Sequence, residues 1–182
     1  MNKRTANLEP DTISIINELI GMQIISTDKG RRIGTLVDLL LDPNMLEVAA
    51  IVTEKGDPLR NDFRAIPSDA VQVWGRDAIL VGETEILRAK NELPDIDNWL
   101  SFVDNILDES VITTSSRRIG KVQDVLINAN GRISAYILHP TESQPRDRDS
   151  KGNKSPGVLR IPVLATHALG TEVLMINEKD LA

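Results

Sequence analysis

The sequence predicts a mostly β protein made of two tandem, small antiparallel barrels joined by an acidic, partly helical linker. Three observations support this fold class. The 182-residue chain contains an internal repeat, and each repeat has the pattern of short strands rich in β-branched and other apolar residues between turns. No crossover helices are expected between those strands. Aromatic residues make up only 3% of the chain, so we expect an aliphatic core.

The repeat is clearest around two Arg-Arg-Ile-Gly segments, which start at Arg31 and Arg117 and so differ by 86 residues. The further identities at that offset are Asp38 with Asp124, Leu40 with Leu126, Asn44 with Asn130, Ala49 with Ala135 and Ile51 with Ile137. Later segments match at offsets of 95, for Ile66-Pro67 with Ile161-Pro162, and 94, for Ile79–Val81 with Val173–Met175. Two copies indicate a duplicated domain, since a solenoid needs three or more repeats.

Within copy one, short apolar and branched runs follow one another between turn signals. The expected strands are 24–26, 32–41, 48–53, 63–66, 71–74 and 78–81. The turn signals are Asp28-Lys29-Gly30 and Asp42-Pro43-Asn44, and copy two has Asn130-Gly131, a strong hairpin signal. These patterns predict the same order of strands in both copies.

The second strand of each copy changes phase. Leu36 is at an even position, whereas the next inward candidates, Leu39 and Leu41, are at odd ones, and copy two repeats the change. Because side chains alternate along a strand, one extra residue near Asp38 and Asp124 would bring all of them inward. We therefore predict a β-bulge in both copies, with the two aspartates pointing outward or capping the bulge.

The segment from Glu83 to Asp108 is the acidic linker, with seven acidic and two basic side chains. Pro94 to Asp97 is a favourable helix start, and Trp99, Phe102, Val103 and Ile106 recur at helical spacing. This pattern predicts a short amphipathic helix packed against the barrels. An exposed Trp99 would instead make the linker a docking site for a partner.

These features give the expected domain organisation. The segments are a disordered N-terminus 1–12, copy one 13–82, the linker 83–108, copy two 109–177 with a mobile surface loop 140–157, and a poorly ordered C-terminal tail 178–182.

Two segments then carry a family resemblance. Residues 32–42 with Ile66-Pro67, and residues 118–128 with Ile161-Pro162, resemble the PRC-barrel family, which is named after the photosynthetic reaction centre H subunit. The ribosome maturation factor RimM also has such a barrel. The resemblance implies a small β-barrel used as an interaction and assembly module, with no shared catalytic residues. Its motif positions in this chain are Gly34, Asp38, Pro67, Gly120, Asp124 and Pro162.

Composition limits the chemistry. The chain has no cysteine, which excludes disulfides and thiolate sites, and only two histidines, His139 and His167. No known catalytic or phosphate-binding motif occurs, so we expect no enzyme activity, no cofactor and no metal site. No apolar run approaches the length of a membrane span and no signal peptide is visible, so the expected location is the cytoplasm.

Two functions are compatible with these observations. The first is a non-enzymatic adaptor that binds another protein or protein complex, with a membrane or photosynthetic complex as the partner and membrane association only through that partner. The alternative is an RNA- or ribosome-associated protein of the RimM kind. The net charge of -6 and the few aromatics argue against nucleic acid. Self-association and a small ligand in the groove between barrels stay open.

One group of basic residues distinguishes the two functions. Arg31, Arg32, Arg117 and Arg118 are candidate contacts for a partner or an anion, or else solvated strand starts. A ribosome-binding protein should gather them on one face together with Arg132 and Arg160.

Overall fold

The computed structural model describes residues 14–55, 63–140 and 158–181. Copy one and the segment before it contain β1 (Ser14–Ile15), α1 (Ile16–Leu19), β2 (Gln23–Ser26), β3 (Arg32–Thr35), β4 (Asp38–Asp42), β5 (Glu47–Lys55), β6 (Phe63–Pro67), the 3-10 turn η1 (Ser68–Ala70), β7 (Val71–Trp74) and β8 (Ala78–Val81). The expected N-terminal segment 1–12 and most of the loop 140–157 lie outside the described residues.

The linker and copy two follow. Their elements are β9 (Arg88–Ala89), the 3-10 turns η2 (Lys90–Glu92) and η3 (Ile96–Asn98), β10 (Leu100–Ser101), the π-helical turn η4 (Phe102–Ile106), β11 (Ser110–Thr113), β12 (Arg118–Ile127), β13 (Ile133–Pro140), β14 (Leu159–Pro162), the 3-10 turn η5 (Val163–Ala165), β15 (Thr166–Leu169), β16 (Val173–Ile176) and the 3-10 turn η6 (Glu178–Asp180).

The chain is mostly β, as predicted, but the sheets do not close into barrels. Copy two forms one open sheet in the order β14-β13-β12-β11-β16-β15, with β1 added to β12. Copy one is divided into the sheets β3-β2-β8-β7 and β10-β4-β5-β6-β9. In copy two the short turn η5 carries the chain from β14 to the opposite edge strand β15, with no ladder between them among the described strands.

The sheets are also not wholly antiparallel. In each copy the first and last strands of the barrel motif run side by side in parallel, β2 with β8 and β11 with β16. These ladders correct the repeat alignment. Ile24 and Val111 are equivalent, because they pair with Gly34 and Gly120, and in the parallel ladders they pair with Ile79 and Leu174. Ile79 therefore corresponds to Leu174, at an offset of 95 rather than 94.

The alignment of the β4–β5 and β12–β13 hairpins needs a second correction. Leu39 pairs with Ile51, and its counterpart Val125 pairs with Tyr136, so Ile51 corresponds to Tyr136 and not to Ile137. The turn of copy two is one residue shorter, which shifts the following strand by one position. The ungapped matches that the sequence shows beyond this turn are therefore not structural equivalents.

The predicted bulge is present in copy two and takes another form in copy one. The β12–β13 register shifts between Val122 and Asp124, which leaves Gln123 as the extra residue. In copy one the same place is a break, between the end of β3 at Thr35 and the start of β4 at Asp38. Both solutions restore the expected phase, since the inward candidates Leu36, Leu39, Leu41, Val122, Val125 and Ile127 are all fully buried.

The linker does not form the predicted amphipathic helix. It consists of the short turns η2 and η3, the two-residue strand β10 and the π-helical turn η4. Asp95 has a φ of 58°, which interrupts any helix that starts at Pro94. The apolar residues are nevertheless packed, because Phe102 and Ile106 are fully buried and Trp99 and Val103 are half-buried.

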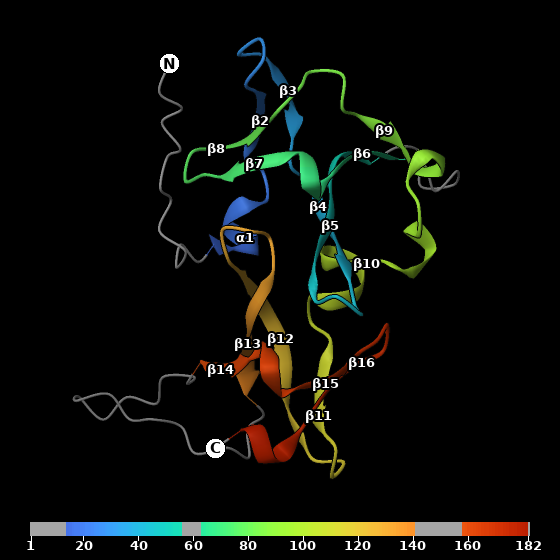
Figure 1. Cartoon of the computed structure of the whole chain (residues 1–182). Coiled ribbons are helices and arrows are strands. Elements are labelled where there is room, and N and C mark those ends of the chain that lie inside the picture. Colours follow the sequence, from blue (N-terminus) through green and yellow to red (C-terminus); the bar gives the residue numbers. More distant parts are fainter. Residues whose placement is uncertain (1–13, 56–62, 141–157, 182) are drawn as a thin grey trace, which may run out of the picture.

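The segments that precede the two copies are exchanged between them. β1 and α1 lie before β2, the first strand of the barrel motif in copy one, but β1 pairs with β12 of copy two, Ile15 facing Leu126. Likewise β10 and η4 lie before copy two, but β10 pairs with β4 of copy one, Ser101 facing Leu40. We call these segments, 14–20 and 100–107, the two arms. Figure 1 shows both arms in the middle of the molecule, between copy one above and copy two below.

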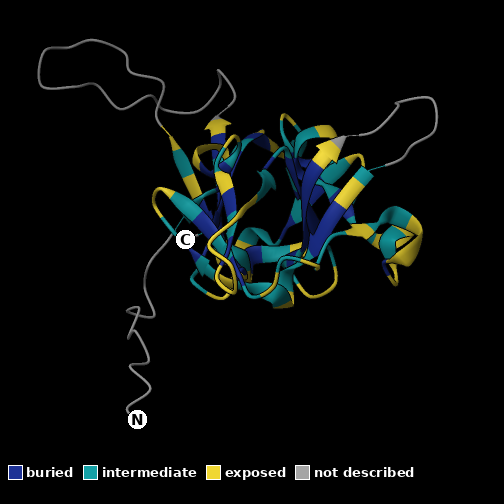
Figure 2. Cartoon of the chain, turned by 90° about the horizontal axis from the view of Figure 1, so that it is seen from above, coloured by how far each residue is buried: buried dark blue, intermediate teal, exposed yellow. Residues whose placement is uncertain are grey.

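The arms and the hairpin tips join the copies into one structure. The β4–β5 and β12–β13 turns meet, with the Val48 amide donating to the Gly131 carbonyl at 2.8 Å and the Ile133 amide donating to Leu46 at 2.8 Å. One hydrophobic cluster contains buried residues of both copies and both arms. In Figure 2 the buried stretches of the ribbon, in dark blue, lie mostly towards the middle of the molecule, while the exposed stretches, in yellow, lie mostly at turns and strand ends.

Candidate partner-binding surface

Asp38 is a buried cap for the arm of the other copy. Its Oδ1 accepts hydrogen bonds from its neighbour's amide, Leu39 N, at 2.8 Å and from Val103 N at 3.1 Å. Its Oδ2 accepts one from Ser101 Oγ at 2.5 Å. Val103 lies in the first turn of η4, whose free amides need acceptors. The carboxylate therefore fixes both the break in its own strand and the arm of copy two.

Asp124 has the corresponding role for the arm of copy one. Its Oδ1 accepts from Val125 N at 2.8 Å and from Asn17 N, in the first turn of α1, at 3.2 Å. Desolvation by burial raises the pKa of Asp124 above its ordinary 3.8, although hydrogen bonds from Val125 and Asn17 act to lower it. Both aspartates are at most 6% exposed, so of the two expected arrangements they do not point outward but cap the bulge or break of their own strand.

The other motif positions are also structural. Gly34 and Gly120 occupy equivalent ladder positions, opposite Ile24 and Val111, as predicted. A Cβ at Gly34 would lie 3.1 Å from Thr53 Cβ, so the close approach of β5 explains this glycine. Pro67 and Pro162 each end a strand immediately before a 3-10 turn, where proline is compatible with the backbone.

The four candidate arginines do not gather into one site. Arg32 begins β3 and Arg118 begins β12, and the β2–β3 and β11–β12 hairpins lie at opposite ends of the molecule (Figure 1). Arg32 Nη2 donates to Thr35 Oγ1 at 2.7 Å, and Arg118 Nη2 donates to Ser110 Oγ at 2.6 Å. A joint anion site of both hairpins is therefore not formed.

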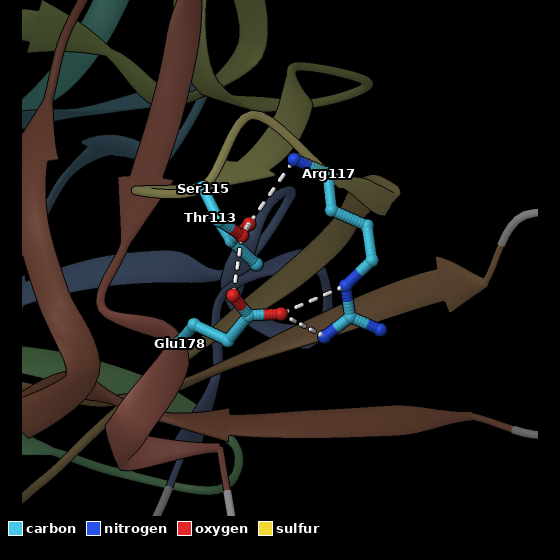
Figure 3. Close-up of polar contacts among 4 residues, drawn as sticks. All are labelled: Thr113, Ser115, Arg117 and Glu178. Atoms are coloured by element: carbon cyan, nitrogen blue, oxygen red, sulfur yellow. Dashed lines mark hydrogen bonds and ion pairs between the residues drawn. The ribbon is translucent and has the colours of Figure 1, made fainter.

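Arg117 takes part in a cluster that holds the C-terminal turn η6. Its guanidinium contacts Glu178 Oε1 through Nη2 at 2.8 Å and Nε at 3.0 Å, and Ser115 Oγ donates to Glu178 Oε2 (Figure 3). The Ser115 hydrogen bond is the main cause that lowers the pKa of Glu178, and Arg117 adds to it, against a smaller desolvation. The sequence predicts a poorly ordered tail after Asn177, whereas the structure places residues 178–180 in the turn η6 with these contacts.

A cavity of about 250 Å³ opens beside the junction of the two copies. Its lining comes from the arm of copy one and from the β7–β8 turn, and comprises Ser14, Ile15, Glu18, Leu19, Met22, Trp74, Gly75 and Arg76. Trp74 is 7% exposed and lies against Gly131 of copy two, whose added Cβ would come within 3.3 Å of the indole. The cavity thus has an apolar floor next to the interface.

Two opposite charges stand at this cavity. Glu18 and Arg76 are both exposed, and neither forms an ion pair with another residue in the described part of the chain. An apolar cavity with unpaired charges of both signs suits contacts to a folded partner or a peptide better than a bare metal or an anion. The sequence did not reveal it, because its lining residues come from segments about 60 residues apart; the rarity of tryptophan was the only signal.

The remaining candidates for chemistry are dispersed. His139 and His167 are both exposed, on β13 and β15. Within the described residues, no group of three or more histidines and carboxylates is placed to hold a metal ion. Among those same residues there is also no helix long and apolar enough to cross a membrane.

Comparison with known proteins identifies the two copies. The PRC-barrel domain family matches residues 11–87 and 100–149, which is more than half of the chain and corresponds to two copies in tandem. No curated protein matches the chain. The first matched segment includes the arm of copy one, and the second begins at the arm of copy two, so each family unit contains the arm that it exchanges.

Proposed function

The chain belongs to the PRC-barrel domain family, and from that premise we propose that it is a non-enzymatic adaptor that binds another protein or protein complex. The observation that carries the proposal is the exchange of arms, which anchors the arm of copy one on β12 of copy two and leaves a cavity between that arm and the β7–β8 turn. The arm is held by a backbone ladder and a buried cap, so this surface is preorganised for a partner.

The chemistry of the cavity supports a protein partner. Met22 and the small accessible part of Trp74 give the cavity an apolar floor, while Glu18 and Arg76 offer charges for its rim. The partner that we propose is a membrane or photosynthetic complex met from the cytoplasm. The alternative, an RNA- or ribosome-binding role, has less support because Arg31-Arg32 and Arg117-Arg118 lie on hairpins at opposite ends.

The test is isolation of the tagged protein from its native cells, identification of what co-purifies, and reconstitution with the purified candidate. The double variant Glu18→Lys/Arg76→Glu should weaken the reconstituted complex at least tenfold, because it reverses both unpaired charges at the cavity. Lys121→Glu, an exposed charge reversal on β12, is the matched control and should leave binding unchanged. A catalytic activity in the purified protein, or binding of RNA alone, would contradict the proposal.

A further inference from the structure

The two copies differ at one strand edge. In copy one β9 pairs with the outer edge of β6, Ala89 facing Arg64 and Arg88 facing Ala65. β14 has the place of β6 in copy two, since Ile66 pairs with Ile51 and Ile161 with the equivalent Tyr136. β14 ends its sheet, and no described strand pairs with its outer edge.

The segment that covers β6 shows what such an edge accepts. After β9, which supplies the ladder, Leu93, Ile96 and Trp99 pack on the outer face of the copy-one sheet, against a cluster with Leu40 and Ala65. We call residues 88–99 the strap. Lys90 Nζ also lies 6.0 Å from the centre of the Phe63 ring. The strap thus combines two ladder residues with apolar anchors that follow them.

Copy two presents different side chains at the same positions. Arg160 replaces Ala65, Val158 replaces Phe63 and Leu164 replaces Asp69, if residues are matched through the β14 ladder. Val158 is 62% exposed and Leu164 is 87% exposed, which is unusual for large apolar side chains. Arg160 is exposed and has no ion-pair partner among the residues that the structure describes.

We propose that the outer edge of β14 binds an extended, acidic segment of a partner protein by strand addition. The incoming strand pairs antiparallel with Leu159 and Arg160, as β9 pairs with β6, and places an acidic residue opposite Arg160. Apolar side chains of that segment cover Val158.

The internal strap indicates the chemistry of the partner segment. Glu92, Asp95 and Asp97 make it acidic around its anchors, but Arg88, opposite Ala65, would face Arg160 at the copy-two edge. A like-charge pair directly across a ladder is unfavourable, so the strap itself suits β6 and not β14. A segment with the strap sequence but an acidic residue at position 88 should bind β14 in preference to β6. This inference rests on the proposed function and names one of its contact surfaces.

The experiment uses the full chain and a labelled synthetic peptide with the sequence of residues 83–99 carrying Arg88→Glu. We expect fluorescence anisotropy to show binding, about fivefold tighter than that of the unaltered peptide. Arg160→Glu in the protein should reverse this preference, whereas Lys121→Glu should not. Val158→Asp should weaken binding, and Met45→Asp, a substitution at a similarly exposed residue of copy one, should not.

Hydrogen exchange on the same complex locates the peptide. Protection should appear at the amides of β14 and leave β6 unchanged. Failure of the peptide to bind, indifference to Arg160→Glu, or protection only elsewhere would overturn the proposal; so would β14 amides already protected in the free protein by another part of its own chain. If a reconstituted partner is lost with Glu18→Lys/Arg76→Glu but not with Arg160→Glu, this inference fails while the proposed function stands.

Discussion

Replacing the buried cap Asp38 should weaken the attachment of the arm of copy two to copy one and so lower the free energy of unfolding. Asp38→Ala leaves the amides of Leu39 and Val103 and the Ser101 hydroxyl without their acceptor, in a site where Asp38 is only 2% exposed. Loss of a helix cap costs about 0.5–2 kcal/mol, and each buried donor left unpaired costs about 1–3 kcal/mol. Partial rehydration of the arm reduces the total, so we expect a loss of about 3 kcal/mol.

The assay is urea unfolding followed by tryptophan fluorescence, with thermal unfolding as a second measurement. A loss of about 3 kcal/mol corresponds to a fall in Tm of about 6–12 °C for a domain of this size. Asp38→Asn keeps an acceptor for the amides and should lose about 1 kcal/mol. Fluorescence should also report the arm, because Trp99 directly precedes β10.

The matched control is Asp42→Ala. Asp42 Oδ1 also accepts two backbone amides, Asn44 N at 2.8 Å and Met45 N at 3.0 Å, but both lie in its own hairpin turn and are exposed. We expect about 1 kcal/mol for this variant. A loss below about 1 kcal/mol for Asp38→Ala, or a loss equal to that of Asp42→Ala, would refute the idea that the arm depends on this carboxylate.

Three further outcomes are expected. Burial raises the pKa of Tyr136 to about 12, with a smaller opposing effect of the Thr166 hydrogen bond. Because Tyr136 is the only tyrosine, the absorbance at 295 nm should titrate near that value, and Thr166→Val should raise the pKa further. Titration near 10 would show an accessible ring. The raised pKa of Asp124 means that its contribution to stability is fully present below pH 3.8 and is lost as the pH rises through the folded-state pKa. The lowered pKa of Glu178 gives a contribution that is present above pH 4.5 and is lost as the pH falls through the folded-state pKa. Asp124→Asn and Glu178→Gln should therefore change the acid limb of the stability–pH curve in opposite directions, and parallel changes would contradict the assignment. Gly131→Ala should lower the free energy of unfolding in urea more than Gly30→Ala does. Both glycines have positive φ, so each substitution costs about 1–2 kcal/mol in backbone strain, but only the added Cβ at position 131 meets Trp74. Equal losses would show that the Trp74 side chain moves aside without cost.

Local sequence patterns were sufficient for several features because their causes are local. Alternation and phase identified the inward residues of β4 and β12, and the phase change itself predicted the irregularity beside Asp38 and Asp124. Gly34 and Pro67 mark a close strand approach and a strand end, which depend on steric properties of single residues. The duplicated motif was sufficient to indicate the PRC-barrel family, which the family comparison confirms.

Features that depend on partners distant in the chain required the tertiary structure. The linker pattern of Trp99 to Ile106 has helical spacing, yet pairing of β10 with β4 outweighed the weak helix propensity of a short segment. The turn before Ile133 is one residue shorter than its counterpart, and only the ladder register showed this. Both β5 and β13 are apolar at most positions, so a shift of one residue still aligns apolar residues with apolar residues. Open sheet edges likewise follow from hydrogen-bond topology, which composition does not specify.

The sequence by itself determined a duplicated, mostly β chain of the PRC-barrel family and the residues that line its core, because these follow from repetition and from the burial of apolar side chains. Tertiary structure alone decided the exchange of the arms, the role of Asp38 and Asp124 as caps for the opposite copy, and the cavity at Trp74. It also decided the edge of β14 with which no described strand pairs. The physical reason is that each depends on groups brought together across about 60–110 residues of chain, where several pairings satisfy the same local pattern and the packing of the whole molecule selects one.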